Sequence, residues 1–144
     1  MAAPLATIFG CEGLGLSETE RAFFRDADPW GFIIFRRNVE TPDQLRALTA
    51  DLRACVGRDA PILIDQEGGR VARLGPPVLR LPPMRSLARA GDVDLTRDAG
   101  CALGRQLRAL GFNLDFAPVL DVDTNPDNPV IGDRSFGDTP GLVI

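Results

Sequence analysis

Residues 61–70 read PILIDQEGGR, and this stretch decides how the rest of the sequence is interpreted. The residues ILI have the character of a buried strand. Asp65, Gln66 and Glu67 follow at once, and then come two glycines and an arginine. A carboxylate placed directly after so apolar a strand starts close to the core, where it needs a partner. The stretch therefore predicts a strand that ends in a polar, functional turn.

Apolar runs and helical patterns alternate on both sides of this stretch. The expected strands are 5–10, 30–35, 61–64 and 113–122. Helices are expected after residues 17 and 41 and over 94–111, and a Pro-rich loop with one short helix is expected before the last of these. The segment after 122 reads as loop. This alternation of strand and helix predicts βαβ units, a parallel sheet of about four strands and an α/β fold.

The helix boundaries carry specific signals. Ser17 and Glu20 have the spacing of a capping box, and Thr41 with Gln44 repeats it. Gly111 predicts the end of the long helix. The buried side of the second helix is expected to contain Leu45, Leu48, Leu52 and Cys55, and that of the long helix Ala99, Ala102, Leu103, Leu107 and Leu110.

Composition excludes several classes of function. The chain has 144 residues, 44% of them hydrophobic, and a net charge of −4, which fits one globular domain and disfavours a nucleic-acid partner. The sequence contains no His, so Ser-His-Asp catalysis, Cys-His catalysis and imidazole metal sites are excluded. No membrane-spanning stretch or signal peptide is expected. Three widely spaced cysteines, expected to be small core residues, fit a reducing cytoplasm: Cys11, Cys55 and Cys101.

Polar residues follow each expected strand. In parallel α/β folds, ligands bind at the carboxyl ends of the strands. The glycines Gly68 and Gly69 are expected to let the backbone turn sharply and approach a ligand. The polar residues at the four strand ends are Glu12, Arg36, Arg37, Asn38, Asp65, Gln66, Glu67, Arg70, Asp121, Asp123, Thr124 and Asn125. Of the later acidic residues, Asp123, Asp127 and Asp138 are interpreted as caps or solvated loop residues.

The residues at these strand ends partly match three ligand motifs. The EGGR segment lacks the spacing and the lysine of a phosphate-binding loop. The segment DVDTNPDN opens like a calcium loop, but Pro126 and Gly132 stand where that loop needs Gly and Glu. A magnesium site formed by Asp65, Glu67 and Asp121 stays open as an alternative.

Four segments together resemble a known family. They are ILIDQEGGRVARL, RLPPMRSLA, LGFNLDFAPVLDV and IGDRSFG, in this order. The sequence resembles glycoside hydrolase family 3 over essentially its whole length, and within it the bacterial β-N-acetylhexosaminidases of peptidoglycan recycling. The resemblance implies a (β/α)8 TIM barrel, of which residues 1–144 would be the N-terminal half of a single catalytic domain, truncated before the catalytic loop.

The resemblance also implies an activity. It points to a cytoplasmic retaining exo-glycosidase without a cofactor or metal. Such an enzyme removes terminal non-reducing β-linked N-acetylglucosamine from muropeptide fragments, such as those bearing anhydro-N-acetylmuramic acid. A β-glucosidase of the same family and a non-catalytic sugar-binding module are the alternatives.

Three residues match positions that bind the sugar in the family: Asp65, Arg73 and Arg134. A carboxylate accepts strong hydrogen bonds from hydroxyl groups, and arginine supplies a rigid fork of donors. Glu67 and Arg70 are expected to support the site structurally.

No catalytic residue is assigned within residues 1–144. The acid/base His and the nucleophilic Asp of the family are expected beyond Ile144. The chain alone is therefore expected to be inactive, and the open edges of half a barrel are expected to favour self-association.

Overall fold

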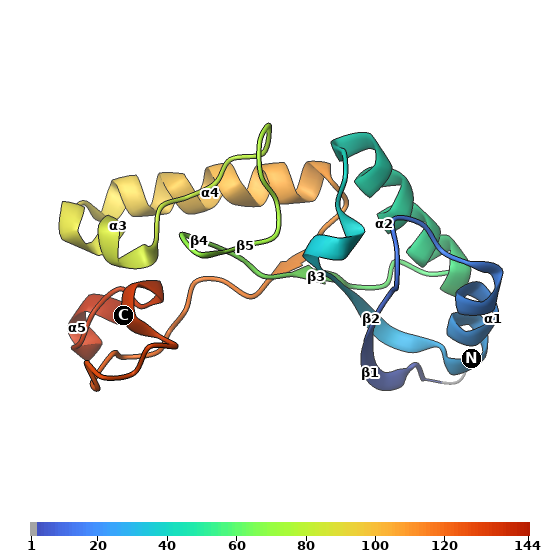
Figure 1. Ribbon diagram of the computed structural model, residues 1–144, viewed down its shortest axis with the longest axis horizontal. Helices are drawn as coiled ribbons and strands as arrows, with labels where there is room; N and C mark the ends of the chain where they lie inside the picture. The colour runs from blue at the N-terminus through green and yellow to red at the C-terminus, as the bar shows by residue number, and fades with distance from the viewer. Residues whose placement is uncertain (1–2) are drawn as a thin grey trace. The chain divides into compact units, whose positions relative to one another are not determined.

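The computed structural model describes residues 3–144, which form two compact units (Figure 1). The first unit contains the chain up to Ile64 together with Leu107–Asp115. The second contains Asp65–Gln106 and Phe116–Ile144.

A parallel sheet forms the centre of the first unit. Its strands are β1 (Leu5–Gly10), β2 (Pro29–Ile34), β3 (Ile62–Ile64) and β6 (Leu114–Asp115), arranged in that order. Every neighbouring pair is parallel. The α/β class and the parallel sheet of four strands predicted from the sequence are confirmed.

Two helices cover this sheet and pack against each other, α1 (Glu18–Ala27) and α2 (Pro42–Val56) (Figure 1). The capping box predicted at the start of α1 is present: Ser17 Oγ accepts the N–H of Glu20, and the Glu20 carboxylate accepts the N–H of Ser17. At the start of α2, Thr41 caps the N–H of Gln44 as predicted. The side chain of Gln44, however, accepts the N–H of Glu40 instead of that of Thr41, so the box is not completed.

The core of the first unit lies between the sheet and the helices. Phe32 on β2 is fully buried, and the ring of Phe24 on α1 meets it edge-on at 5.1 Å between centroids. Burial of each such side chain stabilises the fold by roughly 1.5–3 kcal/mol. Leu45, Leu48 and Leu52 of α2 are buried as predicted, and Thr49 joins them.

The expectation that all three cysteines are core residues is wrong in part. Cys11 is buried, and burial raises the pKa of its thiol to about 11. Cys55 is only half-buried; it lies on the last turn of α2, where its Sγ is 3.3 Å from the carbonyl oxygen of Arg21. Cys101 is exposed, since it lies on the outer side of its helix.

The prediction of a fourth strand over 113–122 is wrong in its length. Only Leu114 and Asp115 pair with β3. Pro118 follows, with a cis Ala117–Pro118 bond, and proline has no N–H to donate to a strand ladder. The chain then continues without regular structure until Gly132.

Short elements and one long helix form the second unit. They are a hairpin of β4 (Gln66–Gly68) and β5 (Val71–Ala72), the helices α3 (Met84–Ala90), α4 (Val93–Ala109, whose last turn lies in the first unit) and α5 (Pro140–Val143), and the 3-10 turn η2 (Gly132–Arg134). The hairpin was not predicted, because strands this short have no periodicity to read. The two short helical segments near residue 144 lie where only loop was predicted.

Helix α4 presents one side to the interior, as predicted. Leu103, Leu107 and Leu110 are buried, and Ala99 and Ala102 are half-buried. Along residues 3–144, every helix is too short or too polar to cross a membrane.

The C-terminal end of α4 depends on Gly111. Its φ is +93°, and an added Cβ would collide with the side chain of Thr49. Thr49 Oγ1 lies 3.0 Å from the carbonyl oxygen of Leu110, to which it can donate. Gly111 therefore lets the chain leave α4 in close contact with α2.

Replacement of Gly111 by alanine tests this contact. We expect Gly111→Ala to lower the free energy of unfolding by about 1–3 kcal/mol more than Gly57→Ala, since it adds overpacking to backbone strain. Gly57 is a matched control, because its φ is +66° and an added Cβ there meets nothing within 4 Å. Urea titration of both variants measures the difference, and equal losses would contradict the assigned contact.

Candidate functional site

Gln66 explains why so polar a segment follows the buried strand β3. Its side chain is 1% exposed, and Oε1 accepts the N–H groups of Arg73 at 2.8 Å and Leu74 at 2.9 Å. Nε2 donates to the carbonyl of Leu74 at 3.3 Å. A buried amide with several backbone partners fixes the two arms of the hairpin against each other. The side chains that flank it are therefore held in fixed positions.

The two glycines of the hairpin let the backbone come close to another segment of the same chain, whereas the sequence predicted a close approach to a ligand. Gly68 has a φ of +100° and Gly69 a φ of +52°, so the sharp turn is as expected. An added Cβ on Gly68 would lie 2.6 Å from the carbonyl oxygen of Pro82. Gly69 donates its N–H to Leu81 at 2.9 Å. These contacts join the hairpin to the segment that precedes α3.

Asp65 and Arg73 form an ion pair at the base of the hairpin. Arg73 Nη2 donates to Asp65 Oδ2 at 2.8 Å. The side chains are 23% exposed for Asp65 and 31% exposed for Arg73, so both remain accessible to a ligand. The pair combines a hydrogen-bond acceptor and a fork of donors within one small surface, which suits a polyhydroxyl ligand.

Glu67 and Arg134 form a second, more buried pair. Arg134 Nε and Nη2 donate to the two carboxylate oxygens of Glu67, each at 2.8 Å. Glu67 is only 5% exposed. These hydrogen bonds raise the pKa of Arg134; burial opposes the rise, and the charges of Glu67, Asp121 and Asp65 add to it. The two-point contact with Glu67 therefore fixes the guanidinium of Arg134 against the hairpin.

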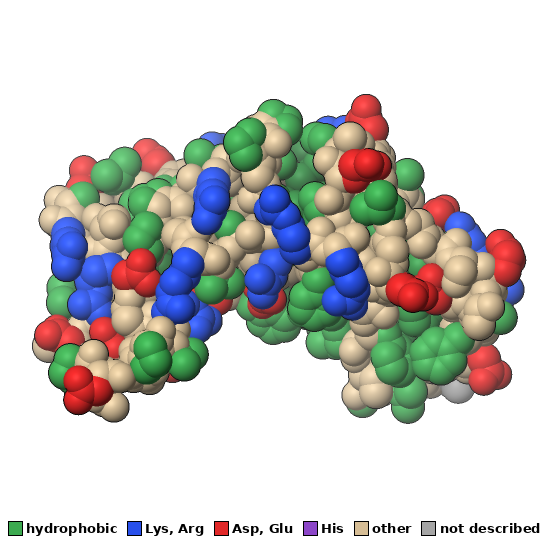
Figure 2. Space-filling view, viewed as in Figure 1, with side chains coloured by type: hydrophobic (Ala, Val, Ile, Leu, Met, Phe, Trp, Pro, Cys, Tyr) green, Lys and Arg blue, Asp and Glu red, His purple; other side chains and the backbone are tan. Residues whose placement is uncertain are grey.

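The second unit thus brings together all three residues predicted to bind a sugar, Asp65, Arg73 and Arg134. Glu67 links Arg134 to the hairpin that carries the other two. Figure 2 shows basic and acidic side chains close together over the elements of this unit. Such a mixed surface is suited to neutral polar groups more than to a polyanion.

Arg70 supports the segment before η2, as expected. Its Nη2 donates to the carbonyls of Pro129 at 2.9 Å, Val130 at 2.5 Å and Ile131 at 3.2 Å. Its Nε donates to Asp133 at 3.3 Å. The irregular chain therefore satisfies its carbonyl groups through one guanidinium.

The interpretation of Asp123 as a cap or solvated residue is wrong. Its carboxylate is 13% exposed and accepts a 2.8 Å hydrogen bond from Arg85. Sequence reasoning also missed Arg85 and Ser135, although both lie in the quoted segments RLPPMRSLA and IGDRSFG. Only contacts between distant segments reveal these roles.

Polar residues at the ends of β1 and β2 hold the first unit together. Asn38 is fully buried, and its amide nitrogen donates to the carbonyls of Cys11 at 3.0 Å and Gly13 at 2.8 Å. Arg37 Nε donates to Cys11 at 3.1 Å, and its guanidinium lies over the ring of Phe35. These side chains stabilise the loop that joins β1 to α1.

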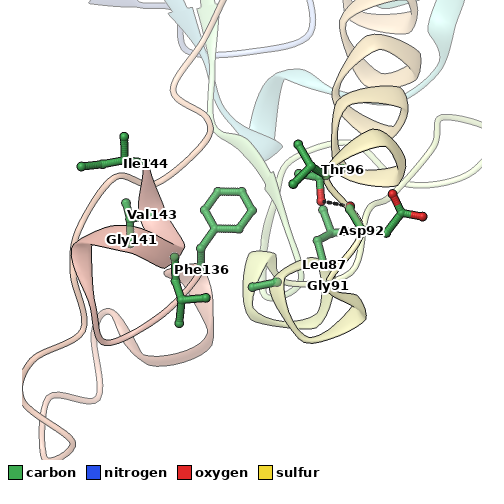
Figure 3. A pocket seen from close by; sticks show the side chains of 11 residues that line it. Leu87, Gly91, Asp92, Thr96, Phe136, Gly141, Val143 and Ile144 are labelled. Atoms are coloured by element: carbon green, nitrogen blue, oxygen red, sulfur yellow. Dashed lines mark hydrogen bonds between the residues drawn. The ribbon is translucent and has the colours of Figure 1, made fainter.

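Two hollows lie in the second unit. The first, about 360 Å³, is lined mainly by apolar residues of α3, α4 and α5 and of the segments beside α5, with Leu87, Phe136 and Ile144 among them (Figure 3). Thr96 donates its hydroxyl to the carbonyl of Asp92 there. The few polar groups in this hollow do not suit a sugar. The second, about 420 Å³, is polar and is lined by Arg85, Asp123, Thr124, Pro126 and Asp138.

The magnesium alternative finds no support in the geometry. The carboxylates of Asp65 and Glu67 are each paired with an arginine. Within residues 3–144, no three His, Cys, Asp or Glu side chains gather in a way that could hold a metal ion.

Solved structures and curated sequences resemble this chain closely. A family 3 β-N-acetylglucosaminidase of Paenibacillus sp. FPU-7 superposes with a TM-score of 0.90 at 42% identity, over 94% of this chain and 27% of that one. NagZ of Neisseria gonorrhoeae in complex with N-trifluoroacetyl-D-glucosamine superposes with a TM-score of 0.83 at 35% identity, over 98% of this chain and 44% of that one. The β-hexosaminidase of Nitrosomonas eutropha is 41% identical over 137 residues, 91% of this chain and 39% of the relative.

The coverage of the relatives is partial. The chain spans 38–41% of the length of the first curated relatives that it matches. The sequence profile described as "Glycosyl hydrolase family 3 N terminal domain" matches residues 14–144. This match covers most of the chain and includes every residue of the Asp65–Arg73 and Glu67–Arg134 pairs. The chain therefore belongs to glycoside hydrolase family 3, within the N-terminal domain of that family.

Proposed function

We propose that residues 1–144 are the N-terminal portion of the catalytic barrel of a β-N-acetylhexosaminidase. The enzyme would remove terminal non-reducing β-linked N-acetylglucosamine from peptidoglycan fragments, in cytoplasmic cell-wall recycling. The names of the relatives support the activity, and their greater length supports a longer catalytic polypeptide.

The observation that carries this proposal is the clustering of Asp65, Arg73 and Arg134. In this proposal the accessible carboxylate of Asp65 accepts hydrogen bonds from sugar hydroxyls, and Arg73 and Arg134 donate to sugar oxygens. Each arginine is held by a carboxylate, at 2.8 Å in both pairs, so the donors are oriented before the sugar arrives. The N-acetylglucosamine analogue bound by the gonococcal NagZ has the corresponding chemistry.

The described residues supply binding rather than the chemical step. A retaining glycosidase needs a nucleophile and an acid/base on opposite sides of the scissile bond. Glu67 is buried and occupied by Arg134 at both oxygens, so it cannot serve as either. Asp65 sits only two residues away. The proposal therefore places both catalytic groups elsewhere in the longer polypeptide.

The 144-residue chain itself should not hydrolyse a glycoside. We expect no turnover of a chromogenic β-N-acetylglucosaminide above background, because the proposal places both catalytic groups elsewhere in the longer polypeptide. The longer polypeptide should hydrolyse this substrate in preference to the matching β-glucoside. Turnover by the chain alone contradicts the division of roles, and a preference for the glucoside favours the β-glucosidase alternative.

Loss of the Asp65 carboxylate should weaken substrate binding in the longer polypeptide. Each hydrogen bond to a charged group contributes roughly 1.5–3 kcal/mol, so we expect Asp65→Ala to lower kcat/KM by about 10-fold to 100-fold. Asp51→Ala is the control, because Asp51 pairs with Arg21 at 2.8 Å in the first unit and is 45% exposed. Steady-state kinetics measure both variants. Unchanged kcat/KM in Asp65→Ala removes Asp65 from the proposed site.

The sheet of the first unit should promote self-association of the 144-residue chain. Its described edges are β1 and β6, and unpaired strand edges are templates for pairing between chains. Sedimentation velocity should show association that grows with concentration, and Ala6→Lys on β1 should reduce it, since an edge lysine opposes pairing. A monodisperse monomer at every concentration contradicts this expectation.

A further inference from the structure

The position of Arg134 depends on the short turn that carries it. Arg134 is the last residue of η2, and Gly132 and Ser135 lie on either side. Gly132 has a φ of +47°, and the segment around η2 has no strand or long helix to hold it. The turn has its own hydrogen bonds, from the N–H of Arg134 to Ile131 at 3.0 Å and from the N–H of Ser135 to Gly132 at 3.3 Å, and side chains of other segments add to this restraint.

Arg85 on α3 binds both sides of this turn. Its Nε donates to the carbonyl of Ser135 at 3.2 Å, and its Nη2 donates to the carbonyl of Gly132 at 3.3 Å. The same Nη2 donates to Asp123 at 2.8 Å. One guanidinium thus holds the residues that flank Arg134 and joins them to the loop that follows β6.

Ser135 reinforces the same connection. Its side chain is fully buried, and Oγ lies 2.5 Å from the carbonyl of Asp121 and 2.9 Å from that of Gly137. Asp123 donates its N–H to Gly137 at 2.9 Å. The loop that contains Asp121 and Asp123 is therefore bonded along its length to the segment after Arg134.

The fork of arginine is essential for this set of contacts. Two carbonyls and one carboxylate lie in different directions, and a planar guanidinium reaches all three with fixed donors. Lysine can keep the charge pair with Asp123, but a single ammonium group does not reproduce the fork. Glu67 orients the tip of the Arg134 side chain, whereas Arg85 orients its backbone.

We propose that Arg85 is a positioning residue that fixes the Arg134 guanidinium in the sugar site by clamping the carbonyls of Gly132 and Ser135. Its kinetic consequence rests on the proposed function, whereas its effect on Arg134 does not. A small displacement of a binding group can lower the rate strongly, because the donors must meet the substrate in a narrow geometry.

Hydrogen exchange at Arg134 tests the clamp directly in the 144-residue chain. In ¹⁵N NMR spectra, exchange of the Arg134 Nε–H should be at least about 10-fold faster in Arg85→Met, because the bond to Glu67 opens more often. In Arg85→Lys, the Arg134 Nε–H should exchange equally fast, but the variant should stay folded because lysine keeps the ion pair with Asp123. Unchanged exchange in folded Arg85→Lys overturns the proposal, even if Arg85→Met fails to fold.

Arg58 provides a matched control in the first unit. Its guanidinium also binds one carboxylate, Asp28 at 3.1 Å, and two carbonyls, those of Pro29 and Trp30. Its side chain is 27% exposed, against 23% for Arg85. Arg58→Met should leave Arg134 exchange within about twofold of the unsubstituted chain, since sites that share no partner usually act independently. An equal effect of Arg58→Met would show general loosening and overturn the clamp.

A double-mutant cycle in the longer polypeptide tests the consequence for catalysis. Arg85→Met should lower kcat/KM for a β-N-acetylglucosaminide by about 10-fold, chiefly through KM. In an Arg134→Ala background, the same substitution should change kcat/KM by less than about twofold, because Arg85 acts through Arg134. A full loss in both backgrounds overturns the proposal. Absence of turnover in the unsubstituted polypeptide would instead refute the proposed function, and the exchange experiment still decides the role of Arg85.

Discussion

The buried ion pair between Glu67 and Arg134 is the constraint on which the second unit depends. Glu67 is 5% exposed, and a carboxylate removed from water without a partner would cost several kcal/mol. Its partner lies 67 residues further along the chain. The long irregular segment after β6 must therefore return to the hairpin, and it must do so in one geometry, because both carboxylate oxygens are bound. The sugar-binding surface that we propose exists only when this return has been made.

Arginine is the only basic residue in the sequence, and the second unit makes full use of its shape. The segment around η2 contains little regular structure, so its carbonyl groups need partners other than a strand ladder. Arg70 binds three successive carbonyls there, and Arg85 binds two more. Guanidinium groups thus replace secondary structure as the source of order. This arrangement leaves Arg73 and Arg134, each held by a carboxylate, as the donors of the proposed site.

The division into two units also separates stability from binding. In the first unit, polar residues at the strand ends form hydrogen bonds with neighbouring backbone: Asn38 and Arg37 bind the loop after β1. In the second, equivalent residues after β3 and β6 converge around Asp65 and Arg134. Because the chain belongs to glycoside hydrolase family 3, we interpret this group of side chains as a sugar site. The same kind of polar strand end therefore serves a structural role in one unit and the proposed binding role in the other.

The amino-acid sequence by itself determined the parallel sheet and the helix caps at Ser17 and Thr41, and it indicated Asp65 as a candidate site residue, because these signals are local or follow a short period. It did not reveal the β4–β5 hairpin, since such short strands have no pattern to read, and the prediction of a strand over 113–122 did not take into account that Pro118 cannot donate to a strand ladder. The burial of Asp123 and the clamp formed by Arg85 were equally hidden. Only the tertiary structure decided those features, because hydrogen bonds between segments dozens of residues apart depend on how the chain returns to itself, which local sequence does not specify.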